Sequence, residues 1–245
     1  MTVPLLEVER VSKWFGGVRA VHDVGFTLEK GAILGVMGPN GSGKTTLFNL
    51  IAGALRPDGG HIRLRGSDIA GMPPHRVCAR GIARTFQLVR PFRELTAREN
   101  VLVGRLYGRQ HGSTAQAVTE SDRLLRLVGL EERATVPAMH LTLVDRKRLE
   151  LARALATAPE ILLLDEFLAG LNPAETASAM DLIRSLRDQG VTILMVEHIV
   201  WALMDLCGRL VVLSAGEKIA EGAPADVAAD PAVVDAYLGA SPAGT

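Results

Sequence analysis

Cysteines, long hydrophobic runs and an excess of charge of either sign are all scarce in this sequence of 245 residues. No apolar stretch approaches the roughly 20 residues that a membrane-spanning helix needs. The N-terminal segment MTVPLLEVER carries charges where a secretory signal has its apolar region. The two cysteines, Cys78 and Cys207, lie far apart without metal-ligand spacing, so we expect them to be small core residues. Secreted, membrane-spanning and disulfide-framed classes are therefore disfavoured.

The charges balance, with 27 Lys and Arg against 27 Asp and Glu. Proteins whose main partner is a nucleic-acid backbone usually carry a basic excess, so we expect no nucleic-acid partner. Hydrophobic residues make up 48% of the chain, which is enough for a packed core and argues against disorder. We expect a cytosolic α/β chain that forms one large domain or two small ones.

Short apolar runs alternate with helical patterns along most of the chain, which is typical of a parallel sheet flanked by helices. Strands are expected at 5–11, 32–37, 61–65, 161–164, 191–196 and 210–213, and helices at 45–54, 115–130, 174–187 and 199–207. Between residues 73 and 159 the pattern is mostly helical, which indicates a helical insertion. Within it, Thr96 and Glu99 match a capping box.

A glycine-rich stretch follows the run that ends at residue 37. It contains the pattern G-x-x-x-x-G-K-[ST] and comprises Gly38, Pro39, Asn40, Gly41, Ser42, Gly43, Lys44, Thr45 and Thr46. Glycines allow positive φ angles, so consecutive N–H groups can point at phosphate oxygens. Lys44 would neutralise charge between the β- and γ-phosphates, and the Thr45 hydroxyl would bind Mg²⁺. A plain glycine-rich turn is disfavoured by the strand before it and the helix after it, so ATP binding with Mg²⁺ is predicted.

Another apolar run ends in two acids, Asp165 and Glu166. In a parallel sheet that is buried on both faces, acids at the carboxyl end of a strand lie at the ligand-binding edge. We expect Asp165 to bind Mg²⁺ through water and Glu166 to orient or deprotonate the attacking water. The plainer alternative is that the two acids merely begin a surface loop. Together with the phosphate loop they predict an ATPase, since no motif for a kinase's second substrate is visible.

With these two motifs the sequence resembles the ATP-binding-cassette (ABC) ATPases over essentially the whole chain. The resemblance implies an α/β fold: a P-loop NTPase (RecA-like) parallel sheet with an N-terminal antiparallel β portion and an inserted helical subdomain. It also implies that Phe15 stacks on adenine, that Gln87 senses Mg²⁺ and nucleotide, and that His198 touches the γ-phosphate. Taken alone, these residues would more often be a core aromatic, a solvated amide and a histidine without a special role.

The resemblance further implies how one cassette is divided. Residues 1–90 and 156–222 would form the RecA-like core with its β portion, 91–155 the helical subdomain, and 223–245 a C-terminal helical tail. Gln87 and the insertion behind it would dock on the membrane partner. The arginines in and before this insertion belong either to that surface or to an ordinary solvated face; they are Arg80, Arg84, Arg90, Arg93, Arg98 and Arg105.

Four stretches, at 15–20, 84–93, 169–173 and 236–239, look like those of the paired ATPase subunits of branched-chain amino-acid importers. Related subunits energise the uptake of urea or short-chain amides. The resemblance implies a second ATPase subunit, transmembrane permease subunits and, indirectly, a solute-binding protein. It also implies a peripheral place on the cytoplasmic side of the membrane.

The stretch 141–146, which aligns with the family signature L-S-x-G-Q, departs from it. Thr142 stands for Ser and Val144 for Gly, although Thr142 and Asp145 also match an ordinary helix start. In the family the signature contacts ATP held by the opposite protomer, so Thr142, Val144 and Asp145 are the candidate contacts. Val144 keeps an N–H, but we expect its branched side chain to crowd a phosphate and to resist positive φ.

One phosphate loop per chain means that a complete site requires two cassettes facing head to tail. We hypothesise a heterodimer in which this chain's loop, Glu166 and His198 meet an orthodox signature from another subunit; a homodimer is the alternative. A regulatory cassette that binds ATP without hydrolysing it is a second candidate, and the intact Glu166 and His198 argue against it. A soluble cassette protein acting on ribosomes or DNA is a third, disfavoured by the neutral charge and the single cassette.

Overall fold

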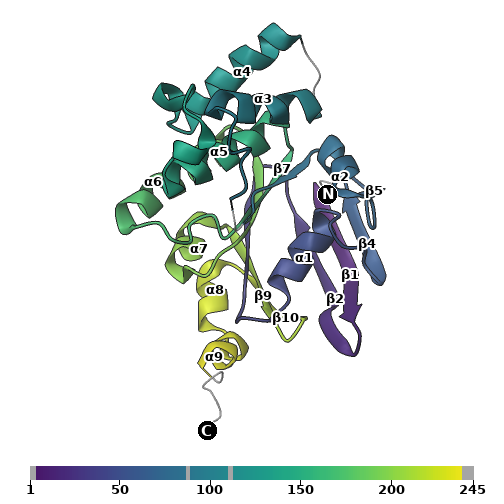
Figure 1. Ribbon diagram of the computed structural model, residues 1–245. Coiled ribbons are helices and arrows are strands. Elements are labelled where there is room, and N and C mark those ends of the chain that lie inside the picture. The colour runs from purple at the N-terminus through teal and green to yellow at the C-terminus, as the bar shows by residue number, and fades with distance from the viewer. Residues whose placement is uncertain (1–3, 87–88, 110–112, 239–245) are drawn as a thin grey trace. The chain divides into compact units, whose positions relative to one another are not determined.

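The computed structural model describes residues 4–86, 89–109 and 113–238 (Figure 1). Contacts within the chain divide it into two compact units. The first unit comprises Met1–Pro73 and Thr192–Thr245, and the second unit is Pro74–Val191.

An antiparallel sheet begins the first unit, with the strand order β2-β1-β4-β5. Its strands are β1 (Leu6–Phe15), β2 (Val18–Leu28), β4 (Gly59–Leu64) and β5 (Ser67–Asp68) (Figure 1). Leu6 lies opposite Leu28 on one side and Leu64 on the other, and all three are buried. This row of leucines shows how inward-facing positions of neighbouring strands build one face of the core.

Four further strands of the first unit follow the order β10-β9-β3-β8. They are β3 (Ile33–Met37), β8 (Thr192–Val196), β9 (Arg209–Ser214) and β10 (Glu217–Gly222). The strand β3 is parallel to both β8 and β9, whereas β10 returns antiparallel to β9. Every residue of β3 and β8 is buried, as the unbroken apolar runs predict for parallel strands covered on both faces.

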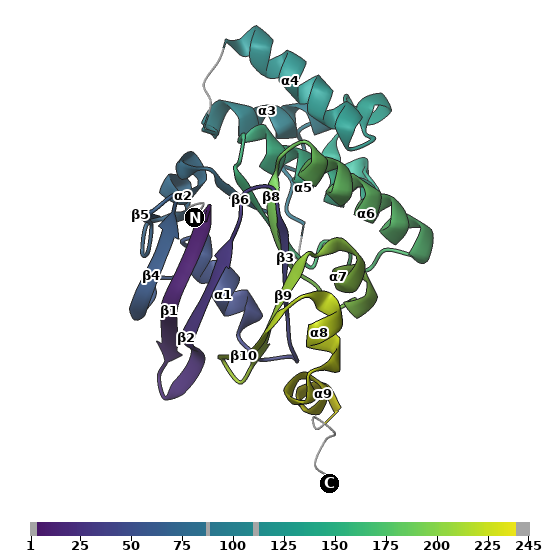
Figure 2. The same ribbon diagram turned by 180° about the vertical axis from the view of Figure 1, so that it is seen from behind.

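The helices of the first unit are α1 (Lys44–Ile51), α7 (Val200–Leu206), α8 (Pro224–Ala229) and α9 (Pro231–Leu238). Figure 2 shows α8 and α9 following one another toward the C-terminus. Helix α7 packs closely on β3, since a Cβ at Gly35 would lie 3.0 Å from Leu203 Cδ2 of that helix. Cys207 is a buried core residue, as expected, and Cys78 of the second unit is half-buried.

The second unit contains two short parallel strands, β6 (Ile82–Arg84) and β7 (Ile161–Asp165). Its helices are α2 (Pro74–Arg80), α3 (Ala97–Tyr107), α4 (Thr114–Leu127), α5 (Leu143–Ala156) and α6 (Pro173–Asp188). The expectation of a mostly helical stretch here is confirmed, but it missed β6, which is three residues long and pairs with β7.

A capping box and a close helix contact at a glycine stabilise the helical part of the second unit. The predicted capping box of Thr96 and Glu99 is present at the start of α3, with hydrogen bonds in both directions. Helices α3, α4 and α5 pack against one another. At Gly104 the backbones of α3 and α5 approach closely, because a Cβ there would lie 2.5 Å from Arg153 O. Among the described residues, no helix combines the length and hydrophobicity that crossing a bilayer requires.

Candidate nucleotide site

The phosphate loop joins β3 to α1 inside the first unit. Its predicted residues all lie in this turn and in the first helical turn: Gly38, Pro39, Asn40, Gly41, Ser42, Gly43, Lys44, Thr45 and Thr46. The φ angle is +150° at Gly38 and +101° at Gly43. A Cβ would lie 2.1 Å from Leu213 O in the first case and 2.3 Å from Ala20 O in the second. The backbone itself therefore requires glycine at both of these positions.

Lys44 lies buried within this loop. Its Nζ donates hydrogen bonds to Gly38 O at 2.7 Å and to Pro39 O at 2.9 Å. These carbonyls compensate the buried ammonium group and keep its charge inside the loop. Helix α1 begins at Lys44 without a side-chain cap, so its first N–H groups are available to an anion. The exposed Thr45 supplies a hydroxyl on the same turn.

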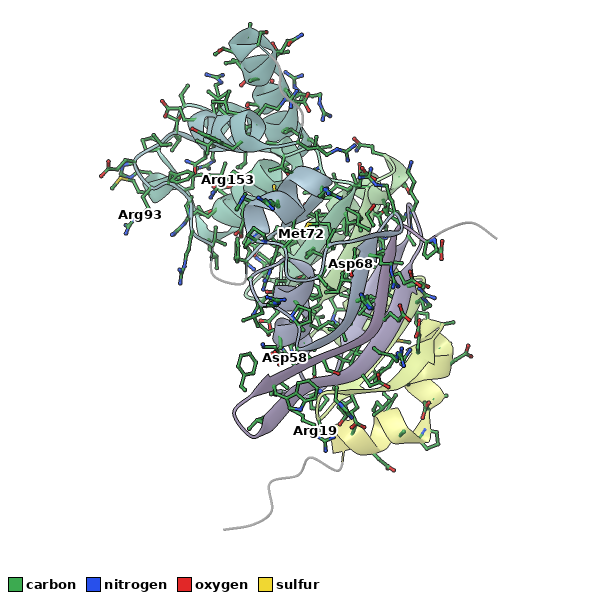
Figure 3. All side chains as sticks on the ribbon, turned by 90° about the vertical axis from the view of Figure 1, so that its right-hand side faces the viewer. Arg19, Asp58, Asp68, Met72, Arg93 and Arg153 are labelled. Carbon is green, nitrogen blue, oxygen red and sulfur yellow. The ribbon has the colours of Figure 1, made fainter. Side chains whose placement is uncertain are left out.

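Phe15 ends β1, and its side chain is 48% exposed. Asp58, labelled in Figure 3, holds the strand end: its carboxylate accepts hydrogen bonds from Trp14 N at 2.8 Å and Lys13 Nζ at 2.9 Å. The Trp14 N–H, followed by Lys13, lowers the pKa of Asp58. Phe15 is therefore not a core aromatic, and an exposed ring on a fixed strand end can stack on a base.

His198 lies in the turn between β8 and α7, where it is exposed. Strands β3 and β8 are parallel neighbours, with Val36 opposite Val196. The turns that follow the two strands therefore leave at the same edge of the sheet, which is where parallel sheets bind ligands. The first unit thus brings His198 to the edge that carries the phosphate loop.

Asp165 and Glu166 belong to the second unit, where Asp165 ends β7. Asp165 is almost fully buried, and its carboxylate accepts a hydrogen bond from Arg84 Nη2 at 2.6 Å. Its backbone N–H donates to Thr85 Oγ1 at 3.3 Å. The reading of Arg84 as part of a solvated or docking face is therefore wrong, because β6 points its guanidinium at the buried end of β7.

Gln87 lies outside the described residues. The residue before it is fixed: Phe86 N donates to Glu150 Oε1 at 3.0 Å. Glu150 is buried on α5, and this burial raises its pKa to about 7. Glu150 is not among the residues that the sequence predicts for the site, since a glutamate within a helix forms no motif of its own.

The signature-like stretch forms the start of α5. The Thr142 hydroxyl accepts a hydrogen bond from Asp145 N at 3.2 Å, so Thr142 is the N-cap that the sequence predicted. Val144 lies in the first helical turn. The concern that Val144 resists a positive φ is therefore unfounded, because an α-helix holds this residue at negative φ. Asp145 lies 3.5 Å from Arg133 Nε.

Comparisons with known proteins agree with this arrangement. A family model described as "ABC transporter" matches residues 21–169, and one described as "Branched-chain amino acid ATP-binding cassette transporter" matches residues 217–243. The high-affinity branched-chain amino acid transport ATP-binding protein BraF of Pseudomonas aeruginosa is 39% identical, with 98% of this chain and 99% of BraF covered. The corresponding protein LivG of Escherichia coli strain K12 is also 39% identical, again with coverage of 98% and 99%.

A solved structure shows the same fold. The ADP conformation of MJ1267, an ATP-binding cassette of an ABC transporter, matches with a TM-score of 0.89 and 31% identity. The match covers 97% of this chain and 100% of that one. The predicted P-loop NTPase fold with an antiparallel β portion and inserted helices is thereby confirmed. The chain belongs to the ABC transporter family, in which it is the ATP-binding and ATP-hydrolysing cassette.

Proposed function

We propose that this cassette drives an importer of branched-chain amino acids or related amides. The observation that carries the proposal is the likeness to BraF and LivG along nearly the entire chain, at 39% identity. The separate family match at 217–243 supports it, because it covers a tail outside the general cassette match. Uptake of labelled leucine, compared with urea and acetamide, in cells with and without this subunit tests the cargo. Uptake of leucine that does not depend on the subunit would contradict the proposal.

In this proposal the first unit binds the nucleotide. The N–H groups of the phosphate loop and of the first turn of α1 hold the phosphates, and Lys44 turns its ammonium from the loop carbonyls to phosphate oxygens. Phe15 stacks on adenine, and His198 contacts the γ-phosphate. The buried charge of Lys44 and the exposed ring of Phe15 support these roles.

The carboxylates of the second unit complete the chemistry. The oxygens of Thr45, Gln87 and Asp165 are the hard ligands that Mg²⁺ prefers, directly or through water. Mg²⁺, when bound, supplies charge that stabilises the phosphate oxygens in the transition state. Glu166 orients the attacking water and accepts its proton. The hydrogen bond from Arg84 fixes the Asp165 carboxylate at the end of β7.

We further propose that two cassettes work as a pair on separate permease subunits at the cytoplasmic face of the membrane, with a solute-binding protein delivering cargo. The predicted division into core, helical subdomain (91–155) and C-terminal tail belongs to this proposal. The exposed rings of Phe86 and Phe92 flank Gln87 in the sequence and offer apolar contacts to a permease. The guanidinium of Arg153, which is labelled in Figure 3, lies 4.9 Å from the Phe92 ring centroid and so holds that ring beside α5.

The ATPase activity of the purified chain, measured across protein concentration, tests the motor role. A rate that rises with the square of concentration and is lost in Glu166→Gln would show a working homodimer. Binding of ATP without turnover would instead indicate an obligate partner that supplies the signature. Full turnover in Glu166→Gln would contradict the role assigned to Glu166.

A regulatory cassette that binds ATP without hydrolysing it is the second candidate, and Val144 is the residue that favours it. The two candidate functions predict different transport activity for the Glu166→Gln variant of the assembled transporter. A motor loses transport when Glu166 becomes Gln, whereas a regulatory subunit keeps it.

A further inference from the structure

The backbone of Glu166 has an unusual conformation. Its φ angle is +50°, in the left-handed region that residues with a side chain seldom adopt. Such a conformation persists only where the surrounding structure enforces it, and it occurs preferentially at functional positions. Because this φ angle sets the direction in which the Glu166 side chain leaves β7, the groups that enforce it also place the carboxylate.

Lys147 of α5 binds the backbone at this point. Its Nζ donates hydrogen bonds to Phe167 O at 2.8 Å and to Glu166 O at 3.3 Å. The same Nζ lies 5.9 Å from the centroid of the Phe167 ring. Lys147 and Phe167 are both almost fully buried. The ammonium group therefore holds two successive carbonyls directly after the strained φ angle.

A lysine at position 147 does not stabilise helix α5 itself. It is the fifth residue of the helix, near the positive end of the helix dipole, where a cation is unfavourable. Burying an ammonium group also costs free energy unless hydrogen bonds compensate it. The carbonyls of Glu166 and Phe167 provide that compensation, and Glu150 lies one turn further along the same helix.

We propose that Lys147 is the positioning residue that holds Glu166 in its catalytic orientation. The inference rests on the role proposed above for Glu166. It also means that one helix links the signature-like stretch to Glu166. Helix α5 begins with the signature-like stretch Thr142–Asp145, and one turn later the same helix holds the backbone of Glu166. A shift of α5 is thereby transmitted to the Glu166 carboxylate of the same chain.

Hydrogen exchange of the full chain tests the contact without requiring turnover. Ala169 N donates to Glu166 O at 3.2 Å, so exchange of the peptide 167–171 reports on this loop. In Lys147→Met we expect this peptide to exchange at least tenfold faster. Lys147→Arg, which keeps a donor cation, and Arg148→Met, which removes the neighbouring cation of α5, serve as controls that retain wild-type exchange. Unchanged exchange in Lys147→Met would overturn the proposal.

Steady-state kinetics of the cassette pair separate positioning from folding. We expect Lys147→Met to lower kcat at least tenfold with the KM for ATP within twofold, and Lys147→Arg to restore most of the rate. In a Glu166→Gln background, Lys147→Met should change the residual rate less than twofold, since it acts through Glu166. An equal loss in both backgrounds would overturn the proposal, as would unaltered kcat. Lys147→Gln replaces Lys147→Met if the latter fails to fold.

The failure of this inference is distinguishable from failure of the proposed function. If Glu166→Gln keeps full turnover, the role of Glu166 is wrong, and the exchange measurement still decides whether Lys147 holds the loop. If Glu166→Gln abolishes turnover while Lys147→Met alters neither kcat nor exchange, only the role of Lys147 is wrong.

Discussion

Buried charged side chains concentrate around the end of β7, and each has a partner that determines what its loss costs. Arg84 and Asp165 form one such pair, with side chains that are 9% and 5% exposed. Removing one member of a buried ion pair leaves the other charge uncompensated in a medium of low polarity. We therefore expect Arg84→Met to destabilise the chain by about 3 kcal/mol, measured as a shift in urea denaturation.

The double variant Arg84→Met with Asp165→Asn is the matched control. It removes both charges, so most of the lost stability should return, although activity should not. If the double variant were as unstable as Arg84→Met alone, loss of packing rather than an uncompensated charge would be the cause.

The buried carboxyl group of Glu150 should make the stability of the folded chain depend on pH. Burial raises its pKa from 4.5 to about 7, Arg153 and Lys147 lower it, and Asp165 raises it further. The unfolded chain releases this proton near pH 4.5, whereas the folded chain keeps it until about pH 7. Raising the pH through this window therefore lowers the stability of the folded state, by at most about 3 kcal/mol.

Glu150→Gln keeps an oxygen acceptor for Phe86 N and removes the charge. We expect this variant to gain stability over the native chain as the pH rises from 5 to 7.5, with no gain near pH 4.5. Urea denaturation at several pH values measures it. The exposed Glu132→Gln is the control, and a gain of the same size there would show a general charge effect.

Strands and helices whose own residues form an apolar run or a helix cap could be predicted from the sequence. The buried strands β3, β7 and β8 are unbroken apolar runs, and caps mark the starts of α3 and α5. Elements whose existence depends on their neighbours were not. β6 has three residues and exists through its pairing with β7, and β2 pairs with β1 through several register shifts that interrupt any simple alternation.

The same distinction holds for the candidate site. The phosphate loop, Asp165 and Glu166 follow from local motifs, because the chemistry there is set by residues adjacent in sequence or by the ends of strands, whereas His198 was implied by the family resemblance. Arg84, Lys147 and Glu150 act through contacts made across 81, 20 and 64 positions respectively, which one sequence does not reveal.

The C-terminal helix α9 contacts the start of the phosphate loop. The Tyr237 side chain lines an apolar cavity of about 360 Å³ together with Met37, the residue before the loop. Burial raises the pKa of Tyr237, and a backbone hydrogen bond from Gly38 opposes this rise. We expect Tyr237→Phe to weaken ATP binding about fivefold, the equivalent of about 1 kcal/mol for one hydrogen bond, because Gly38 loses a restraint.

Titration with a fluorescent ATP analogue measures this change. Tyr107→Phe removes the same hydroxyl from an 82% exposed side chain of the second unit and is the matched control. Equal affinity in Tyr237→Phe and the native chain would show that the tail only caps the fold.

The effect of Val144 on ATP hydrolysis can be tested only in the assembled transporter. Val144 occupies a helical position behind the Thr142 cap, so we expect its branched side chain, rather than its backbone, to crowd a phosphate bound by another subunit. If the partner supplies the orthodox signature, the site that holds this chain's loop and Glu166 carries the turnover. Val144→Gly should then leave the ATPase rate of the complex equal or raised, whereas Glu166→Gln should abolish it.

Val144→Ala refines this comparison, because Gly in the first turn of α5 also weakens the helix, by up to about 1 kcal/mol relative to Ala. Alanine removes the branch without that cost, so it should match or exceed the rate of Val144→Gly. A steep loss of turnover in both variants would mean that Val144 itself makes a productive contact, and the heterodimer with unequal sites would be wrong. Both variants remove the branched side chain next to the nucleotide. If only Val144→Ala raises the ATPase rate, the weaker helix α5 of Val144→Gly is the reason that the rate of that variant does not rise.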